Sequence, residues 1–367
     1  MRFTVSQSAL LNALSIVGKG IASNSTLPLL SGIYIKAENG TLELQTTDLT
    51  ISIRHKLTAN IEEEGETVLS GKLLQNIVKN LSDAAVTFES QDASVYITCE
   101  KSHYLLNALD PMDFPEFPQF AVEKSVELPR DVLGTMVDKV YRVTSKDTSR
   151  PILSGVLLTV EDNVVRLVAT DSYRLAVCDT NVETSGLEGV FEAIVSGTVF
   201  HDVLSLPSET SSIMIGKTDS QVVFVFGNTT YVSRRIEGNY PNYKQILPSS
   251  CNTTVKINVD EFSAALKRVS VIAVNNPSVK MDIDADAAIL KLSTTSQDQG
   301  EASESIACEV EGDSVVTGLN YHYVFDCVNA QSQEKEMILE LKDGRSPGIF
   351  KSFSKINYLY LLMPVRM

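Results

Sequence analysis

Few residues of this chain have the types and spacing that catalysis requires. Gly216-Lys217-Thr218 matches the end of a phosphate-binding loop. Such a loop needs another glycine five residues before Gly216, where this chain has Ser211, and a helix directly after the lysine. Residues 221–226 are instead almost wholly apolar and β-branched or aromatic, which favours a strand. We therefore expect a hairpin turn at this position and no nucleotide site.

Three aspartates have the alternating spacing of calcium ligands. Asp282, Asp284 and Asp286 match the first half of a calcium-binding loop. Position six of that loop should be glycine and is Ala287, and position twelve should be glutamate and is Ser293. We expect the polar face of a half-buried strand.

The remaining titratable residues form no recognisable centre. The run 62–64 is three glutamates, which is typical of a solvated loop, and no sequence resembles a nucleophile elbow. The four histidines lie far apart and none has metal-ligand spacing; they are His55, His103, His201 and His322. The sequence thus predicts no catalytic centre, no metal and no cofactor.

One pattern occurs three times along the chain. Residues 25–32 (STLPLLSG) return as 148–155 (TSRPILSG), so that Pro28 and Pro151 lie 123 positions apart (151 − 28). Residues 44–48 (LQTTD) return at the same interval as 167–171 (LVATD), and 292–296 (LSTTS) is a weaker third copy. A period near 120 residues is the size of one ordinary domain. We therefore expect three copies of one domain.

Further repeats place the boundaries. The aromatic-Pro-polar-aromatic sequences 114–117 (FPEF) and 240–243 (YPNY) each close a unit, and a glycine precedes the second helix of each unit at Gly71, Gly197 and Gly318. The expected domains are 1–122, 125–248 and 252–367.

The composition limits the class of protein. The 367 residues are 43% hydrophobic, enough for several cores, and no apolar run is long enough for a membrane span. The net charge of −15 argues against a protein that coats nucleic acid by bulk attraction, and the absence of Trp argues against a base-stacking platform. Residues 9–22 are apolar but carry Asn12, Ser15 and Lys19 at helical spacing, which favours a surface helix over a leader. Five scattered cysteines fit the reducing cytoplasm.

The elements predict an α+β fold with antiparallel sheets. Residues 32–45 alternate on both sides of Asn39-Gly40, the strongest short hairpin signal. Two helices are expected in each unit, over residues 7–17 and 72–81, 130–143 and 199–206, and 261–273 and 321–330.

Three segments together resemble a known family. They are 169–176 (ATDSYRLA), 233–243 (SRRIEGNYPNY) and the C-terminal 361–367 (LLMPVRM). With the length, the three repeats and their spacing, the whole chain resembles the β subunit of bacterial DNA polymerase III, the sliding clamps.

The resemblance implies a head-to-tail dimer that forms a ring of six clamp domains, with sheets outside and two helices per domain lining the hole. Spheres the size of a 120-residue domain, with a radius of about 17 Å, leave a hole of ~5 Å when three touch and roughly 35 Å when six do. B-DNA needs at least ~20 Å. The implied partners are double-stranded DNA, the replicative polymerase, a clamp loader, and other replication and repair proteins that carry short linear motifs, with no membrane and no cofactor.

The resemblance also implies a peptide-binding groove between the second and third units. This chain has Ser172-Tyr173 where the family commonly has Gly-His, and Gln245 where it commonly has a basic residue. The implied groove residues are Leu153, Thr170, Ser172, Tyr173, Arg174, Leu175, Pro241, Ile246, Tyr323, Ser346, Leu361, Met363, Pro364, Val365 and Arg366.

The resemblance also implies a dimer seam and a set of residues that face the DNA. The first-unit loop has Asn24 where the family usually has a basic residue, so no DNA contact is assigned there. The dimer seam is expected at Tyr104, Leu106, Val271 and Ile272. The DNA-facing residues are expected to be Lys72, Lys79, Lys139, Arg142, Lys146, Arg150 and Lys267.

Two other classes of protein remain as alternatives. One is an enzyme with its site at a domain junction, for which an acid–base or metal set would be expected there. The other is a cytoplasmic β-rich scaffold that never contacts DNA, which basic residues on the helix faces opposite the sheets argue against.

Overall fold

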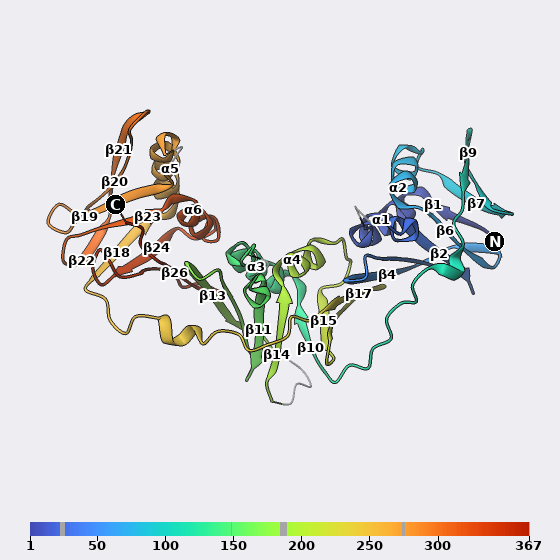
Figure 1. Cartoon of the computed structure of the whole chain (residues 1–367), viewed down its shortest axis with the longest axis horizontal. Coiled ribbons are helices and arrows are strands. Elements are labelled where there is room, and N and C mark those ends of the chain that lie inside the picture. The colour runs from blue at the N-terminus through green and yellow to red at the C-terminus, as the bar shows by residue number, and fades with distance from the viewer. Residues whose placement is uncertain (23–25, 148, 184–188, 274–275, 367) are drawn as a thin grey trace. The chain divides into compact units, whose positions relative to one another are not determined.

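The computed structural model describes residues 1–366 except 23–25, 148, 184–188 and 274–275. Ser25 and Thr148, which begin two repeats, and Asn24 therefore lie outside the described residues. The chain forms two compact units (Figure 1). Unit 1 holds Met1–Asp131 and Asp202–Arg235, and unit 2 holds Val132–Glu183, residues 189–201 and Ile236 onward.

Unit 1 contains two antiparallel sheets of eight and five strands. Helices α1 (Gln7–Val17) and α2 (Gly71–Asn80) pack against each other, and α1 covers strands of the longer sheet. The longer sheet has the order β10 (Lys124–Pro129), β15 (Ser212–Lys217), β16 (Gln221–Phe226), β17 (Thr229–Arg234), β4 (Ile51–Thr58), β3 (Thr41–Thr47), β2 (Gly32–Glu38) and β6 (Gly65–Ser70). The shorter has the order β5 (Asn60–Glu63), β1 (Arg2–Ser6), β7 (Ala85–Gln91), β8 (Ser94–Cys99) and β9 (Ser102–Asn107).

Unit 2 contains two antiparallel sheets of nine and four strands. Helices α5 (Val259–Val269) and α6 (Tyr321–Asn329) pack together, and α5 contacts β20 and β21. The longer sheet has the order β14 (Phe191–Ser196), β11 (Gly155–Glu161), β12 (Val164–Thr170), β13 (Arg174–Asn181), β26 (Asn357–Leu362), β25 (Gly348–Ser352), β24 (Glu336–Leu341), β18 (Thr253–Asn258) and β22 (Glu309–Gly312). The shorter has the order β21 (Gly300–Ala307), β20 (Ile289–Ser296), β19 (Ser278–Asp284) and β23 (Val315–Asn320).

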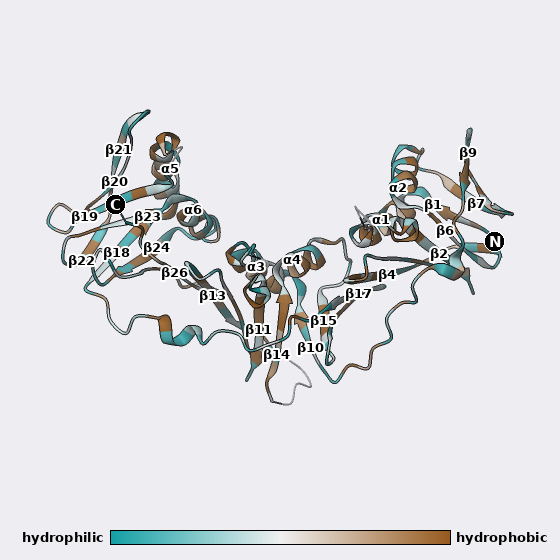
Figure 2. Cartoon of the chain, in the orientation of Figure 1, coloured by the Kyte–Doolittle hydropathy of each residue, from teal (hydrophilic) through white to brown (hydrophobic). Residues whose placement is uncertain are grey.

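The α+β class and the six expected helices are confirmed. The other two helices are α3 (Arg130–Val140) and α4 (Gly197–Ser205). A boundary between the two compact units falls within each of them. In α1 the expected surface positions Asn12 and Ser15 are exposed, as is Lys19 in the 3₁₀ turn that follows, while Leu10, Leu14 and Val17 are buried. Strands β11 and β14 are mostly hydrophobic, as Figure 2 shows; residues 155–158 of β11 are all buried, whereas β14 exposes Glu192. None of the described helices is long and apolar enough to cross a membrane.

The strand orders repeat three times. The series β6-β2-β3-β4 in unit 1 has the same connectivity as β14-β11-β12-β13 and β23-β19-β20-β21 in unit 2. The series β1-β7-β8-β9 matches β10-β15-β16-β17 and β18-β24-β25-β26. Because β17 pairs with β4 and β26 with β13, the longer sheet of each unit continues from one repeat into the next. The two compact units therefore cross the repeat borders, and the boundaries at 122–125 and 248–252 remain a prediction.

The repeated Thr-Asp pair has a local structural cause. After β3, the Asp48 carboxylate accepts hydrogen bonds from the backbone N–H groups of Thr50 and Ile51, both at 2.8 Å, and Leu49 has φ +72°. After β12, Asp171 accepts from Tyr173 at 3.0 Å and Arg174 at 3.1 Å. Both pairs build the same turn between two antiparallel strands, in which the aspartate replaces backbone acceptors.

The two misleading sequence matches fold as expected, except that Asp286 lies in the turn after the strand. Gly216 and Lys217 end strand β15, and Thr218 forms a hairpin turn in which its N–H donates to the carbonyl of Gln221 at 3.0 Å. Asp282 and Asp284 lie in β19, with the buried side chains of Met281 and Ile283 on the other face.

We expect Asp48→Ala to lower the free energy of unfolding by about 1–3 kcal/mol, because two backbone donors lose a charged acceptor. Urea unfolding followed by circular dichroism measures the change. Asp113→Ala removes the same charge from an exposed position and should stay within about 0.5 kcal/mol of the parent. Equal effects of the two substitutions would contradict a structural role for the turn.

Candidate binding groove

A groove of about 680 Å³ lies in unit 2 where β12 ends and β13 begins. Its floor includes Leu361 of β26, which pairs with Leu175 of β13. Nine of the expected groove residues line it: Leu153, Thr170, Ser172, Tyr173, Arg174, Pro241, Ile246, Leu361 and Met363.

The groove is apolar at its base and polar at its rim. Beneath it, Leu361 belongs to a buried cluster with Leu157, Val168 and Leu175. One wall is the 3₁₀ turn Pro151–Ser154, and another is the segment that connects β17 to β18. The Tyr240 hydroxyl fastens this segment to the sheet by donating to the carbonyls of Val168 at 3.3 Å and Gly155 at 3.4 Å. Such a cavity suits a short peptide with apolar side chains.

The loop between β12 and β13 holds a serine in a backbone conformation that favours glycine. Ser172 has φ +78°, a left-handed conformation that costs a non-glycine residue about 1–2 kcal/mol. Its hydroxyl accepts a hydrogen bond from Nη1 of Arg150 at 3.0 Å, and its N–H donates to Oγ1 of Thr170 at 3.3 Å. The next residue, Tyr173, is 64% exposed and lines both the groove and a neighbouring cavity of about 710 Å³.

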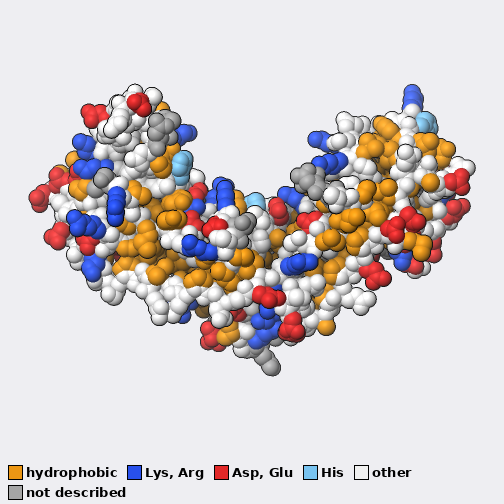
Figure 3. Space-filling model, viewed as in Figure 1, with side chains coloured by type: hydrophobic (Ala, Val, Ile, Leu, Met, Phe, Trp, Pro, Cys, Tyr) orange, Lys and Arg blue, Asp and Glu red, His pale blue; other side chains and the backbone are white. Residues whose placement is uncertain are grey.

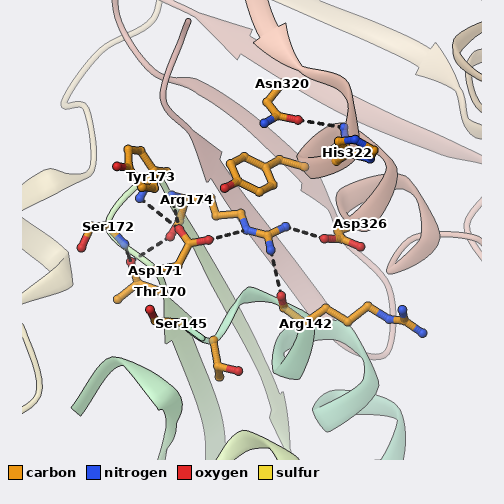
Figure 4. A network of polar contacts seen from close by, with 12 residues as sticks. Arg142, Ser145, Thr170, Asp171, Ser172, Tyr173, Arg174, Asn320, His322 and Asp326 are labelled. Carbon is orange, nitrogen blue, oxygen red and sulfur yellow. Dashed lines mark hydrogen bonds and ion pairs between the residues drawn. The ribbon is translucent and has the colours of Figure 1, made fainter. Parts of the chain in front are cut away.

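Arg174 is the centre of the polar network in Figure 4. Its Nε donates to Asp171 at 2.9 Å, its Nη2 donates to the carbonyl of Arg142 at 2.8 Å, and its Nη1 contacts Asp326. The guanidinium also lies over the ring of Tyr323, 4.1 Å from the centroid. Burial alone lowers the pKa of Arg174, but the surrounding hydroxyl and carboxylate groups raise the pKa above its usual value. Arg174 therefore ties the groove loop to α6 and to the turn after α3.

Six expected groove residues do not line the groove. Leu175 is buried beneath it, and Tyr323 lines the neighbouring cavity. Ser346 lies in a turn held by Asp343, whose carboxylate accepts from the Ser346 N–H at 2.7 Å. The C-terminal segment crosses from Tyr173, whose carbonyl accepts from Met363, to β23, where Gly318 accepts from Val365 at 2.8 Å. Pro364, Val365 and Arg366 follow this path outside the groove lining.

Other groove residues were not expected. The sequence contained signals for most of them, because 148–155 and 240–243 are repeated segments. A repeat by itself predicts a shared local structure and not the wall of a site, and Arg150 is expected from the resemblance to face DNA. These residues are Ser149, Arg150, Pro151, Ile152, Glu237, Asn242 and Tyr243.

Two of the expected DNA-facing residues are placed differently. Lys139 is only 8% exposed, and its Nζ donates to the carbonyl of Ala330, 4.0 Å from the Glu334 carboxylate and above the ring of Tyr358. Burial lowers the pKa of Lys139. Its helical spacing suggested an exposed face, but the packing of α3 in unit 2 covers it. Arg150 lies at the groove, bonded to Ser172.

The other basic residues are exposed. Lys72 and Lys79 lie on α2, and Lys267 lies on α5. Arg142 and Lys146 line the cavity beside the groove.

The expected seam residues lie on or beside two edge strands. Edge strand β9 of unit 1 contains Tyr104 and Leu106, but Leu106 is 8% exposed whereas Leu105 is 57% exposed. Alternation along the strand directs Leu106 towards its own core and Leu105 outwards, and the seam at Tyr104 and Leu106 stays a prediction. In unit 2, Val271 is 72% exposed and Ile272 half-buried, in a 3₁₀ turn that packs beside edge strand β21.

Three models of one family match consecutive parts of this chain. The N-terminal, central and C-terminal domains of the DNA polymerase III beta subunit match residues 1–118, 127–242 and 244–366. The beta sliding clamp of Synechococcus elongatus is 27% identical, with all of both chains covered.

Solved structures give the same result. The DNA polymerase sliding clamp from Bacillus subtilis is 26% identical with a TM-score of 0.93, covering 100% of this chain and 99% of that one. The sliding clamp from Bartonella birtlesii bound to griselimycin is 28% identical with a TM-score of 0.91, covering 100% of both. The three domain matches and the full-length likeness lead to one conclusion: the chain belongs to the DNA polymerase III beta subunit family, the bacterial sliding clamps.

Proposed function

We propose that two copies of this chain close head to tail into a ring of six domains around duplex DNA. The ring tethers the replicative polymerase to its template after a clamp loader has placed it there. Other replication and repair proteins attach by short linear motifs that bind the groove. The role is mechanical, without a catalytic centre or cofactor, and its place is the cytoplasm, where bacterial DNA is copied. Membership of the clamp family supports this role.

The proposed ring rests on one observation: two strands that occupy matching places in the repeats are left as sheet edges among the described strands. By strand order, β17, β26 and β9 occupy the same place in the three repeats, and so do β4, β13 and β21. Two of the three possible pairs exist within the chain, β17 with β4 and β26 with β13. Among the described strands, β9 and β21 are left as sheet edges. An open edge presents unpaired backbone groups that another strand can cover. A second copy of the chain can pair its β21 with this chain's β9 and its β9 with this chain's β21. These two contacts would close a ring.

Leu105→Asp combined with Val271→Asp should convert the dimer into folded monomers. Both side chains are exposed beside the two edges, and a buried carboxylate there would be strongly unfavourable. Analytical ultracentrifugation gives the mass, and circular dichroism checks the fold. Met112→Asp, at a position 86% exposed, is the control and should remain dimeric. A double variant that stays dimeric would place the seam elsewhere.

The acidic charge is consistent with sliding. A ring that moves along DNA is held by its topology, so it needs few phosphate contacts, and each chain carries −15. The exposed basic residues on or near helices are the candidates for those contacts: Lys72, Lys79, Arg142, Lys146 and Lys267. Arg268, the next residue on α5, is paired with Glu304, with Nε at 2.9 Å from the carboxylate.

Binding to linear duplex should be weak, with a slope of log K against log salt near −3.6 for about four phosphate contacts. Lys72→Glu with Lys79→Glu changes four side chains in the dimer and should bring this slope closer to zero, measured by fluorescence anisotropy across a salt series. Lys291→Glu is the control, because Lys291 lies on the face of β20 opposite the buried Leu290 and Leu292. A nanomolar, salt-insensitive affinity would contradict a sliding ring.

Truncation after Leu362 should weaken the binding of polymerase peptides ten-fold or more. It removes Met363 from the groove wall, and burial of a side chain of this size is worth about 1.5–3 kcal/mol. Strand β26 stays complete, so the dimer and its retention on circular DNA should persist. Ile289→Ala, an aliphatic truncation on β20, is the control for peptide binding by isothermal titration calorimetry. Unchanged affinity after the truncation would mean that the groove is not the partner site.

A further inference from the structure

The sheet face that carries the groove has a second cavity, of about 360 Å³. Its apolar lining comes from three elements: Val177 of β13, Leu359 of β26, and Leu247 of the segment between β17 and β18. Phe353, directly after β25, also lines this cavity and is 68% exposed. This volume lies within the range of ligand-binding pockets, about 300–1,000 Å³. We call it the flank cavity.

The flank cavity is continuous with the groove. Leu361 in the groove floor pairs with Leu175, and Leu359 in the flank cavity pairs with Val177, the next position on the same face of both strands. Two residues along a strand correspond to about 7 Å. Tyr243 lines both cavities. An extended chain advances about 3.3–3.6 Å per residue, so about two residues beyond the groove segment reach the flank cavity.

The polar lining of the flank cavity is mainly basic. Arg166 is paired with Asp179 at 3.4 Å, and Asp179 also accepts from Asn357 at 3.1 Å. Lys351 is paired with Glu340 at 2.6 Å, outside the lining. Lys244 is exposed and has no carboxylate partner among the described residues. Three cations and one carboxylate therefore line this cavity on a chain whose net charge is −15.

Apolar side chains also gather at the surface around the flank cavity. Figure 3 shows hydrophobic side chains gathered over β13 and β26 on the face in view, with acidic side chains mainly beyond this area. An exposed aromatic side chain beside an apolar cavity is typical of a binding surface, because covering it removes apolar area from water.

We infer that the flank cavity binds the segment of a partner protein that adjoins the groove-binding motif. The segment inserts one leucine or aromatic side chain between Phe353 and Leu359 and places an acidic residue beside Lys244. The inference rests on the proposed function, because it takes the groove as the site of the motif itself. It adds a second, charge-selective point of recognition that would discriminate among partners with similar motifs.

The test uses the full-length dimer and two fluorescein-labelled peptides. Both come from the clamp-binding segment of the replicative polymerase of the same bacterium: a six-residue core, and the core with its four native residues on each side. On the parent protein the long peptide should bind about ten-fold more tightly than the core. Phe353→Ser with Lys244→Glu should reduce this advantage to less than two-fold and leave the affinity for the core unchanged. Both positions are exposed, so the fold should be retained.

Lys335→Glu, an equally exposed charge reversal before β24, is the matched control and should preserve the advantage of the long peptide. The inference is overturned if the long peptide binds no better than the core, or if the double variant keeps the advantage or weakens both peptides equally. The truncation after Leu362 tests the groove separately from the flank cavity. If it leaves both affinities unchanged, the groove itself is wrong.

A photo-crosslink locates the occupant directly. Phe353 is replaced by p-benzoylphenylalanine, and the dimer is irradiated with the polymerase subunit. Mass spectrometry should find the crosslink in the residues that adjoin the motif. A crosslink only to a second copy of this chain would assign the flank cavity to self-association and would overturn the inference.

Discussion

The pairing of strand edges is the constraint on which the rest of this structure depends. A sheet of four or five strands has two edges whose backbone groups need partners. Here the chain covers one such edge in each unit by adding a strand from the next repeat, β17 onto β4 and β26 onto β13. The groove exists because of the second pairing, since its floor is formed where Leu175 of β13 meets Leu361 of β26. The element that joins two repeats is thus also the base of the candidate partner site.

Much of the fold could be predicted because it depends on local patterns. The six helices follow from apolar periodicity, and the Thr-Asp turns follow from a short polar side chain that bonds its own backbone. Burial could not be predicted in the same way. Lys139 has the spacing of an exposed helical residue, yet another part of unit 2 packs over it. Leu106 and Leu105 are equally apolar, and only the pairing of β9 with β8 decides which one is buried.

The candidate groove shows the same division between local and tertiary information. The resemblance supplied the segments, and nine of its expected residues line the cavity. It could not supply the role of Arg174, which depends on Asp326 and Tyr323 of α6, about 150 positions later in the chain. Nor could it supply Arg150, which bonds the hydroxyl of Ser172. That bond offsets part of the cost of a non-glycine residue in a left-handed conformation.

The equivalence of the three strand pairings has a consequence for how the proposed ring comes apart. The segments 108–123 and 235–252 join consecutive repeats, so the repeats that meet at the β4–β17 pair and at the β13–β26 pair are each connected by a short stretch of the same polypeptide. A separated pair of this kind meets its partner again at an effective concentration in the millimolar range. The β9–β21 pair of two chains has no such tether. Even if all seams had the same intrinsic free energy of association, lowering the protein concentration would favour dissociation of the untethered β9–β21 seams alone. A machine that pulls on the ring would therefore split it between chains, at a seam that cannot reclose by itself once the subunits have diffused apart.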